Sequence, residues 1–308
     1  MQPRGPIMKI GVSIRSFYPP GESRAIVDSM VSRVAAARRA GLDSLFVGDH
    51  HATPSPYIQN VPILGRLLAE WGDAPVGALF LLPLWDPVLL AEQIGTLASI
   101  AQGRFIAQCC VGAQPEQFRA LGKDPSRRGR DFEIHFDILR RLLAGESAKH
   151  PVSGAEVSIS PSPPEPVEYW IGADVPVAID RAARLADAWL VGPNVLPDTA
   201  AQQLASYYDR CAHYDRIPRA TPIRRNCHVS GSAAEVERDL PFIVDQAALG
   251  ADPGCLIIGT IDQVASQLRT LAANGFSDVI VRHFHPEESE VLASTERLAV
   301  VREQVQDA

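Results

Sequence analysis

Three adjacent residues, Asp49, His50 and His51, are the clearest candidates for chemistry in this sequence. They follow the apolar run Ser44–Val47 and precede a segment rich in turn-forming residues, a pattern that predicts the end of a buried strand. An imidazole can donate or accept a proton near neutral pH, and a neighbouring carboxylate can orient it. The pattern therefore predicts a catalytic site at this strand end. The alternative interpretation is a hydrogen-bonded loop histidine beside a turn or cap residue.

The elements that must position this site alternate between strands and helices along the chain. We expect strands at residues 8–14, 44–47, 76–82, 104–111, 168–171, 188–191, 223–229 and 278–283, with a further apolar piece at 255–258. We expect helices at residues 23–40, 59–71, 88–101, 129–144, 175–186, 198–214, 233–249, 262–274 and 287–305. Asp86, followed by Pro87, is expected to cap the helix at 88–101.

Eight strand–helix units in one chain predict an α/β fold, the closed parallel (β/α)8 TIM barrel, as a single domain over residues 1–308. The proline-rich segment 145–167 is expected to be an excursion with little regular structure. The alternative architecture is a doubly wound open sheet. Its GxGxxG fingerprint is missing after the first predicted strand.

Histidines gather at the predicted carboxyl ends of two strands, which in such a barrel surround one pocket. Of the eight histidines in the chain, four lie at these ends: His50, His51, His283 and His285. A second hypothesis follows, in which Asp49, His50, His283 and His285 are metal ligands of a hydrolase. Pocket lining explains the alternating pair His283 and His285 equally well, and we assign no residue to a metal.

Two short turns have the composition of a phosphate site. Gly172, Ala173 and Val175 lie between a predicted strand and a predicted helix, and Thr260 precedes another helix. Backbone N–H groups at the start of a helix, together with the helix dipole, favour a phosphate. A tight turn or a helix cap is the alternative role for each of them.

Composition excludes several classes of function. The net charge of −7 argues against nucleic-acid binding, which needs clustered basic residues. Five cysteines without a CxxC pair favour a reducing cytosol over a disulfide framework. The N-terminus lacks the apolar core of a signal peptide, and the most apolar segment, residues 75–90, is broken by prolines. We therefore expect a cytoplasmic protein that binds neither membrane nor nucleic acid.

Several segments resemble the luciferase-like family of flavin- and deazaflavin-dependent oxidoreductases and monooxygenases. They are residues 41–51, 86–105, 169–173, 182–189 and 258–260, of which residues 86–105 are the most specific. The resemblance implies a (β/α)8 barrel that holds a flavin or deazaflavin ring at the carboxyl ends of its strands, and a homodimer. It also implies that the family's active-site histidine is His50, preceded by Asp49 where many deazaflavin enzymes have aspartate.

The resemblance also implies the surroundings of the ring. A non-proline cis peptide bond, expected here at Ala78–Leu79, commonly supports it. Cys110 corresponds to a reactive thiol beside the flavin of the luciferases, whereas Val111 replaces an arginine that binds the FMN phosphate there. The phosphate is then expected on Gly172, Ala173 and the helix start near Val175, together with Thr260.

The implied cofactor is a deazaflavin (coenzyme F420) or FMN, and the substrate is a small organic molecule. The implied reaction is hydride transfer or monooxygenation, in which the cofactor carries the difficult chemistry and His50 handles a proton. Phe46, Phe80, Leu82 and Trp170 are candidates for an apolar wall beside the ring. A flavin-binding protein without turnover is the remaining alternative, besides the metal-dependent hydrolase.

Overall fold

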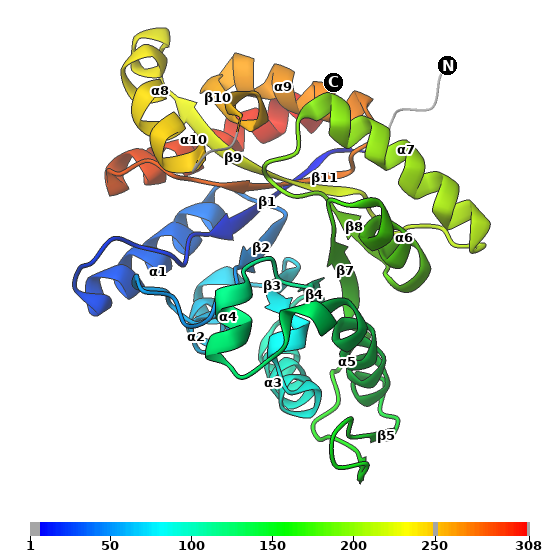
Figure 1. The fold of residues 1–308 in the computed structure, drawn as a ribbon. Coiled ribbons are helices and arrows are strands. Elements are labelled where there is room, and N and C mark those ends of the chain that lie inside the picture. Colours follow the sequence, from blue (N-terminus) through cyan, green and yellow to red (C-terminus); the bar gives the residue numbers. More distant parts are fainter. Residues whose placement is uncertain (1–6, 249–251, 307–308) are drawn as a thin grey trace. The chain divides into compact units, whose positions relative to one another are not determined.

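Strands and helices alternate along the chain as the sequence predicts (Figure 1). The structure, a computed structural model, describes residues 7–248 and 252–306. The strands are β1 (Lys9–Ile14), β2 (Ser44–Val47), β3 (Val76–Leu81), β4 (Phe105–Cys110), β5 (Ala148–Lys149), β6 (Glu156–Val157), β7 (Glu168–Gly172), β8 (Ala188–Leu190), β9 (Pro222–Ser230), β10 (Ile257–Thr260) and β11 (Asp278–Arg282). The α-helices are α1 (Ser23–Arg39), α2 (Asn60–Trp71), α3 (Pro87–Ile100), α4 (Pro115–Ala120), α5 (Arg128–Leu143), α6 (Pro176–Leu185), α7 (Pro197–His213), α8 (Ala233–Ala248), α9 (Ile261–Ala273) and α10 (Glu288–Gln306). Three short 3-10 helices are η1 (Leu82–Leu84), η2 (Pro125–Arg127) and η3 (Pro253–Cys255).

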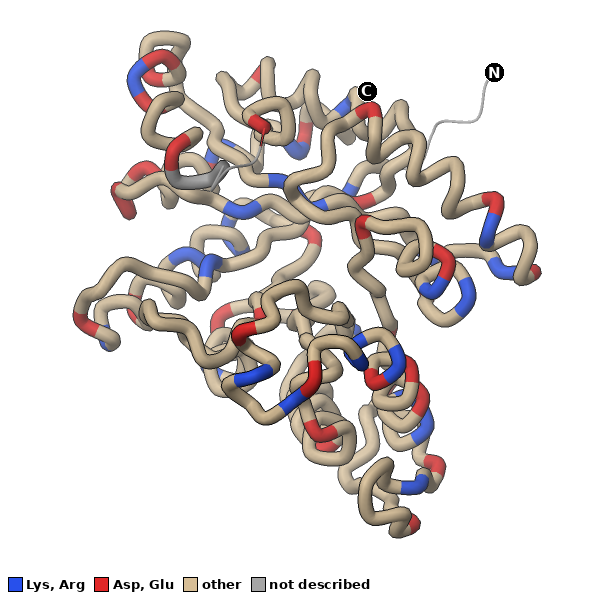
Figure 2. Tube along the Cα trace, viewed as in Figure 1, with Lys and Arg blue, Asp and Glu red and all other residues tan. Residues whose placement is uncertain are grey.

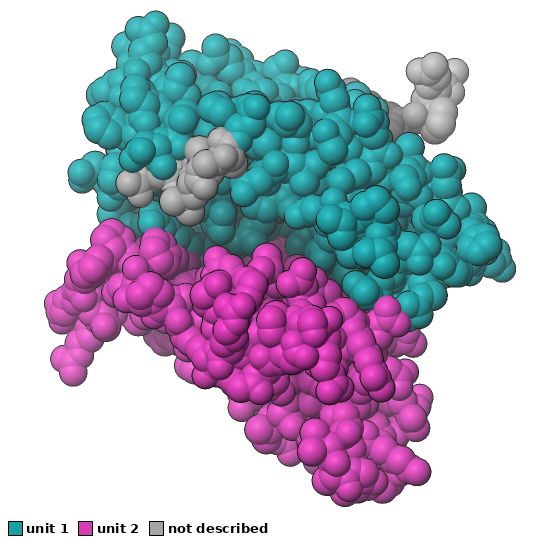
Figure 3. Space-filling view, viewed as in Figure 1, with its two compact units in different colours: residues 1–15, 28–45, 170–308 teal, residues 16–27, 46–169 magenta. Residues whose placement is uncertain are grey.

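The predicted element boundaries agree with these bounds to within two residues. The predicted helix end at residue 249 and the N-terminal residues 1–6 lie outside the described residues. The chain separates into two compact units (Figure 3). The first unit comprises residues 1–15, 28–45 and 170–308, and the second comprises residues 16–27 and 46–169. The expected single domain over residues 1–308 stays a prediction.

In the first unit, parallel strands form a continuous sheet. β1 pairs with β11, and β11 pairs with the first half of β9. The bridge between Val191 and Ile223 connects the end of β8 to β9, and β8 pairs with β7. The second half of β9 pairs with β10, the apolar piece expected at 255–258. Because β9 is nine residues long, it can pair with β11 along its first half and with β10 along its second half.

In the second unit, β3 and β4 pair in parallel register from Val76 with Phe105 to Leu81 with Cys110. Gly77 permits this close approach, since a Cβ atom there would lie 1.8 Å from the carbonyl oxygen of Ile106. Helix α2 packs against β3 and helix α3 against β4, while α5 packs against α3 and η1. Their buried apolar faces follow the helical spacing that the sequence shows, and burial of such faces is the main stabilising contribution.

The structure corrects one expectation in the second unit. The segment 145–167, expected to be an excursion with little regular structure, contains one short antiparallel pair, β5 with β6, and its description as an excursion stays a prediction. The expected cis peptide bond at Ala78–Leu79 is wrong. Among the described residues the cis bond is Ser160–Pro161, and β3 keeps one regular register through residues 78 and 79.

Charged residues of both signs are interspersed along the chain (Figure 2). Over the described residues, no helix combines the length and the apolar character that crossing a bilayer requires.

Asp86 begins α3 as the sequence predicts, and its removal tests that role. Its carboxylate accepts hydrogen bonds from the N–H groups of Val88 and Leu89, at 2.9 and 3.1 Å. Asp86→Ala should lower the free energy of unfolding by about 1–2 kcal/mol, measured by denaturant titration, because the cap is lost. Asp86→Ser retains a capping oxygen and should cost less. An equal loss in both variants would contradict the capping role.

Candidate active site

The buried carboxylate of Asp49 joins the end of β2 to the end of β3 in the second unit. Its Oδ2 atom accepts hydrogen bonds from the Leu81 N–H and from the Trp85 indole N–H, both at 2.8 Å. Its Oδ1 atom lies 3.1 Å from Nε2 of His51. Asp49 is only 1% exposed, and a buried carboxylate is tolerated only where donors such as these surround it.

His50 is oriented by the main chain of Asp49. Its Nδ1 atom lies 2.7 Å from the Asp49 carbonyl oxygen. Because that oxygen can only accept, the ring carries its proton on Nδ1, and Nε2 presents a lone pair. The sequence led us to expect orientation by the Asp49 side chain. That carboxylate is instead directed at Leu81, Trp85 and His51, because β2 ends beside these donors.

Tyr57 supports the His50 ring from one side. The two rings stack with centroids 5.6 Å apart and planes 24° from parallel. Gly48 allows this arrangement, since a Cβ atom there would lie 2.7 Å from the Tyr57 hydroxyl. An antiparallel bridge between Phe17 and Tyr57 holds the loop that carries the tyrosine. His50 is thus a half-buried imidazole with a fixed ring plane.

His51 has a different environment from His50. Its main-chain N–H donates to the side-chain oxygen of Gln117, at 3.1 Å. Its ring meets Trp85 edge-on, with centroids 5.3 Å apart, while Trp85 also meets Phe80 edge-on. The ring contact with Asp49 and Trp85 therefore assigns His51 to the packing around the carboxylate.

The predicted cofactor contacts on β3 and β4 lie on both faces of this strand pair. Leu79 and Cys110 share one face, where they pack against Leu81, Leu84 and Phe118. Ala78, one residue before Leu79, points to the opposite face and is fully buried. The structure therefore brings Leu79 and Cys110 together and separates the Ala78 side chain from them.

Gln108 adds an unexpected polar group to the face of Leu79. It is the register partner of Leu79 and is buried. Its side-chain Nε2 atom has no hydrogen-bond partner among residues 7–248 and 252–306. A buried amide N–H without an acceptor is costly, so this donor suits the oxygen or nitrogen acceptor of a bound group.

His135 of α5 fixes the position of η1, which carries Leu82. Its Nδ1 atom lies 2.9 Å from the Leu82 carbonyl oxygen. Burial lowers the pKa of His135 below its usual value, against the opposing effects of this hydrogen bond and of the charge on Asp131. The His135 side chain thus connects helix α5 to the turn that leads to Trp85.

The predicted phosphate turn lies in the first unit, between β7 and α6. Gly172 ends β7, and Val175 is the N-cap residue of α6, without a side-chain cap and 54% exposed. Ala173 is already engaged at both of its main-chain groups. Its N–H donates to the Leu190 carbonyl at 3.3 Å, and its carbonyl accepts from the Trp189 indole at 2.7 Å.

Asp174 in this turn carries a perturbed carboxyl group. Burial raises its pKa, against the opposing effects of the Gly192 N–H bond and of the Arg225 charge. Arg225 is itself buried and donates to the carbonyl groups of Gly192, Arg224 and Val195. Burial lowers the pKa of Arg225 to about 10. These contacts stabilise the loop that follows β8, which is joined to the turn by the hydrogen bond from Gly192 to Asp174.

Thr260 forms the N-terminal cap of α9. Its side chain accepts from the backbone of Gln263, and the Gln263 side chain accepts from the Thr260 N–H at 2.9 Å. This capping box satisfies two helix-start donors without a ligand. It is the alternative role that the sequence left open for Thr260.

His283 and His285, expected in a pocket, are both buried in the first unit. Nδ1 of His283 lies 3.2 Å from the hydroxyl of Ser294, which accepts the Val229 N–H. Nδ1 of His285 accepts the Glu287 N–H at 3.1 Å. Burial lowers the pKa of His283 to about 3. Neither side chain borders the two cavities beside α5.

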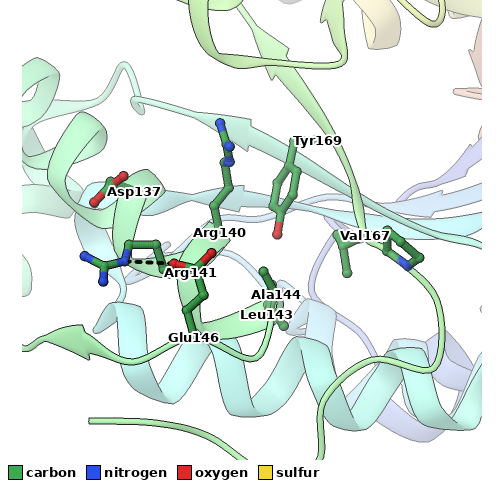
Figure 4. Close-up of a pocket in the computed structure, with 9 residues that line it drawn as sticks. Asp137, Arg140, Arg141, Leu143, Ala144, Glu146, Val167 and Tyr169 are labelled. Carbon is green, nitrogen blue, oxygen red and sulfur yellow. Dashed lines mark hydrogen bonds and ion pairs between the residues drawn. The ribbon is translucent and has the colours of Figure 1, made fainter. Parts of the chain in front are cut away.

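A cavity of about 190 Å³ lies elsewhere in the second unit (Figure 4). Figure 4 shows Tyr169 pointing toward the residues at the end of α5, where Arg141 pairs with Glu146. Tyr169 is the second residue of β7, so the cavity lies at the amino end of that strand. Active sites of barrels form at the carboxyl ends, and no predicted site residue borders this cavity.

The comparisons with known proteins identify the family. A model of the family described as luciferase-like monooxygenase matches residues 8–253. The chain belongs to the luciferase-like monooxygenase family. Curated mycobacterial relatives are 28% identical over 114 residues, which are 36% of this chain, and the chain spans about two fifths of their length. The F420-dependent glucose-6-phosphate dehydrogenase of Nakamurella multipartita is 24% identical, over 60% of this chain and 59% of the relative.

Solved structures confirm the predicted α/β fold, the luciferase-like TIM barrel. The monooxygenase RslO1 of Streptomyces bottropensis superposes with a TM-score of 0.83, at 17% identity, covering 95% of this chain and 98% of that chain. The oxygenating constituent of 3,6-diketocamphane monooxygenase from Pseudomonas putida, solved in complex with FMN, superposes with a TM-score of 0.81. It is 15% identical and covers 98% of each chain.

Several residues of the candidate site escaped the sequence analysis. Trp85, Tyr57, Gln108 and Gln117 all contact or flank the predicted residues. Trp85 was detectable in principle, as a lone aromatic residue beside the strand end at Leu82. Gln108 and Gln117 have no distinguishing pattern, because their contacts depend on segments far apart in the sequence. Tyr57 is near His50 in the sequence, but no pattern there indicates that the two rings stack.

Replacement of Asp49 tests its position between β2 and β3. Asp49→Ala leaves the buried N–H groups of Leu81 and Trp85 without an acceptor, each at about 1–3 kcal/mol. The free energy of unfolding from a denaturant titration should therefore fall by about 2–5 kcal/mol. Asp73→Ala, at an exposed carboxylate, is the control. A loss no greater than that of the control would show that the carboxylate does not stabilise the strand ends.

Proposed function

We propose that this chain is an oxidoreductase that uses a reduced deazaflavin (coenzyme F420) or FMN. It would transfer a hydride to a small organic substrate or monooxygenate it, with His50 as the proton donor or acceptor. Membership of the luciferase-like monooxygenase family supports the reaction class. The F420-dependent relative and the FMN complex among the structural neighbours support the two cofactors.

The single observation that supports the role of His50 is the way its ring is hydrogen-bonded and stacked. Nδ1 is engaged by the Asp49 carbonyl, and Tyr57 fixes the ring plane. Nε2 is therefore the atom that would accept a proton from the substrate and return it. Asp49 contributes through its carbonyl, while its carboxylate holds Leu81 and Trp85 in place.

The residues of the second unit fit a planar redox cofactor. The bound group would supply the hydride or electron chemistry, which the side chains of this chain do not provide. Leu79 and Cys110, half-buried beside the apolar cluster of Leu81 and its neighbours, would cover a ring face and exclude water. The buried Gln108 Nε2 atom would donate to a polar edge of the ring.

We propose separately that the phosphate of the cofactor binds at Gly172 and the start of α6 near Val175. The exposed N-cap position of Val175, without a side-chain cap, supports this proposal. Ala173 would line the turn through its side chain, since both its main-chain groups are engaged. A contact from Thr260 would have to come from its hydroxyl hydrogen, because the oxygen accepts in the capping box.

The metal-dependent hydrolase finds less support. The group of acidic and histidine residues that the described part of the chain brings within metal-binding reach is His228, Asp239 and Glu290. It contains neither Asp49 nor His50, and Oδ2 of Asp49 already accepts hydrogen bonds from Leu81 and Trp85. The homodimer, the cytoplasmic location and the absence of membrane and nucleic-acid partners belong to the proposal and depend on the family and the composition.

His50→Ala tests the catalytic role. The variant should bind the reduced cofactor about as well as the wild type but lose about 100-fold or more in kcat, because general acid–base catalysis contributes about 10²–10⁴-fold. Quenching of tryptophan fluorescence during titration with reduced F420 and with reduced FMN measures binding and shows which cofactor is preferred. His213→Ala, at an exposed histidine, is the control. An unchanged kcat would remove His50 from the mechanism.

Gly172→Asp tests the phosphate proposal independently of His50. A carboxylate at this turn should weaken cofactor binding by about tenfold or more through like-charge repulsion. Gly172→Asn has nearly the same shape without the charge and should weaken binding less. Equal affinities for both variants and the wild type would place the phosphate elsewhere, whatever the outcome for His50.

A further inference from the structure

A group of buried polar side chains in the first unit takes no part in the proposed redox site. His228 on β9 is completely buried, and neither of its ring nitrogens has a hydrogen-bond partner within the two described ranges. Its ring stacks on His285, with centroids 5.1 Å apart. Asp239 on α8 is buried beside both rings, and Glu290 on α10 is half-buried.

The ligand atoms of this group lie close enough together to share a metal ion. Nε2 of His228 lies 3.7 Å from Oδ2 of Asp239, and the ligand atoms of His228, Asp239 and Glu290 all lie within 4.8 Å of one another. Two ligand atoms about 2.0–2.2 Å from a tetrahedral ion are about 3.3–3.6 Å apart. Two atoms bonded to one bridging water at about 2.8 Å each are about 4.5 Å apart. The observed separation of 3.7 Å is closer to that of two ligands of one ion than to that of two partners of one water.

His285 contributes a second contact to Asp239 without being a ligand itself. Its Nδ1 atom accepts the Glu287 N–H, so a neutral ring carries its proton on Nε2. That Nε2 atom lies 3.7 Å from Oδ1 of Asp239. At this distance His285 does not hydrogen-bond to Asp239, whose carboxylate is oriented by Arg238, with Oδ2 on the side of His228.

The charges around the group favour a cation. Asp239, Glu290 and Glu235 contribute three carboxylates, against the guanidinium groups of Arg238 and Arg297. Arg238 forms two hydrogen bonds with Asp239 and lies 3.7 Å from Glu290. Its side chain is 56% exposed, so it can move into solvent when an ion takes its place.

Strand β9 and helix α10 hold His228 and Glu290 in register. The Val229 N–H, next to His228, donates to the Ser294 hydroxyl at 2.7 Å. Glu290 precedes Ser294 by four residues, so both side chains lie on the same face of α10. An ion would connect this pair to α8 through Asp239.

We infer that His228, Asp239 and Glu290 form a binding site for a divalent transition-metal ion such as Zn²⁺. An imidazole with two carboxylates suits Zn²⁺ or Mn²⁺ and disfavours Mg²⁺, which prefers oxygen ligands alone. The ion stabilises the packing of α8 and α10 against β9. The inference is independent of the proposed redox function, and its test requires no flavin.

Titration of the chelator-treated full chain with Zn²⁺ tests the site. Calorimetry and elemental analysis should give one ion per chain, and Zn²⁺ should raise Tm by several degrees because it binds only the folded state. Mn²⁺ should bind more weakly, and Mg²⁺ should have no effect. Absence of stoichiometric Zn²⁺ binding would overturn the inference.

Three variants locate the ion. His228→Phe should weaken Zn²⁺ binding by more than about 100-fold, since even second-shell partners contribute about 10–100-fold. Its Tm without metal should equal or exceed that of the wild type, because an unpartnered buried polar ring is removed. Glu290→Gln should weaken binding at least about tenfold. Glu235→Gln, an equally exposed carboxylate that also pairs with arginine, is its matched control and should change affinity little.

Arg238→Ala provides a test in the opposite direction. The variant removes a positive charge that competes with the ion for Asp239, so the affinity for Zn²⁺ should rise above that of the wild type. His213→Ala should leave binding unchanged, since His213 is an exposed histidine on α7. Zn²⁺ binding that survives His228→Phe and Glu290→Gln, or that depends on His213, would assign the ion to the surface and contradict the site.

Discussion

The arrangement of the candidate active site depends on one buried carboxylate. Asp49 cannot remain ionised inside the protein unless donors surround it, and the Leu81 N–H and the Trp85 indole supply two of them. These two hydrogen bonds fix the end of β2 against the end of β3. The main-chain carbonyl of the same residue then fixes the ring of His50. The side-chain carboxylate of Asp49 thus holds the strand ends together, while its main-chain carbonyl orients the candidate catalytic ring.

The need of the buried Asp49 carboxylate for polar partners also gives the two neighbouring histidines different roles. The ring of His51 is directed at the Asp49 carboxylate and at Trp85, so its contacts are those of a packing residue. His50 has one nitrogen engaged and stacks on Tyr57, which leaves the other nitrogen for a reacting group. A side chain that participates in proton transfer must retain an atom that folding has not used.

In the first unit, most buried polar groups have partners. Arg225 is buried and satisfied by three carbonyl groups, and the Trp189 indole is satisfied by Ala173. His228 differs from them, since burial and the neighbouring His285 lower its pKa to about 4 while its ring nitrogens have no partner in the described part of the chain. Such an exception needs an explanation, and a bound ion is the explanation that the 3.7 Å separation between His228 and Asp239 favours.

The sequence by itself determined the order of the main strands and helices, the Asp86 cap and the placement of His50 at the end of β2, and the strand–helix alternation predicted the barrel fold. The element order and the cap are local features, because hydrophobic periodicity and capping residues act within one turn or one strand. The short elements α4, β5 and β6 carry too little periodicity to be predicted. The tertiary structure alone decided which atoms of Asp49 are used, that Ala78 and Leu79 face opposite sides, and that His228 meets Asp239 and Glu290. Those outcomes depend on contacts between segments far apart in the chain, and no local pattern encodes the distance between two such side chains.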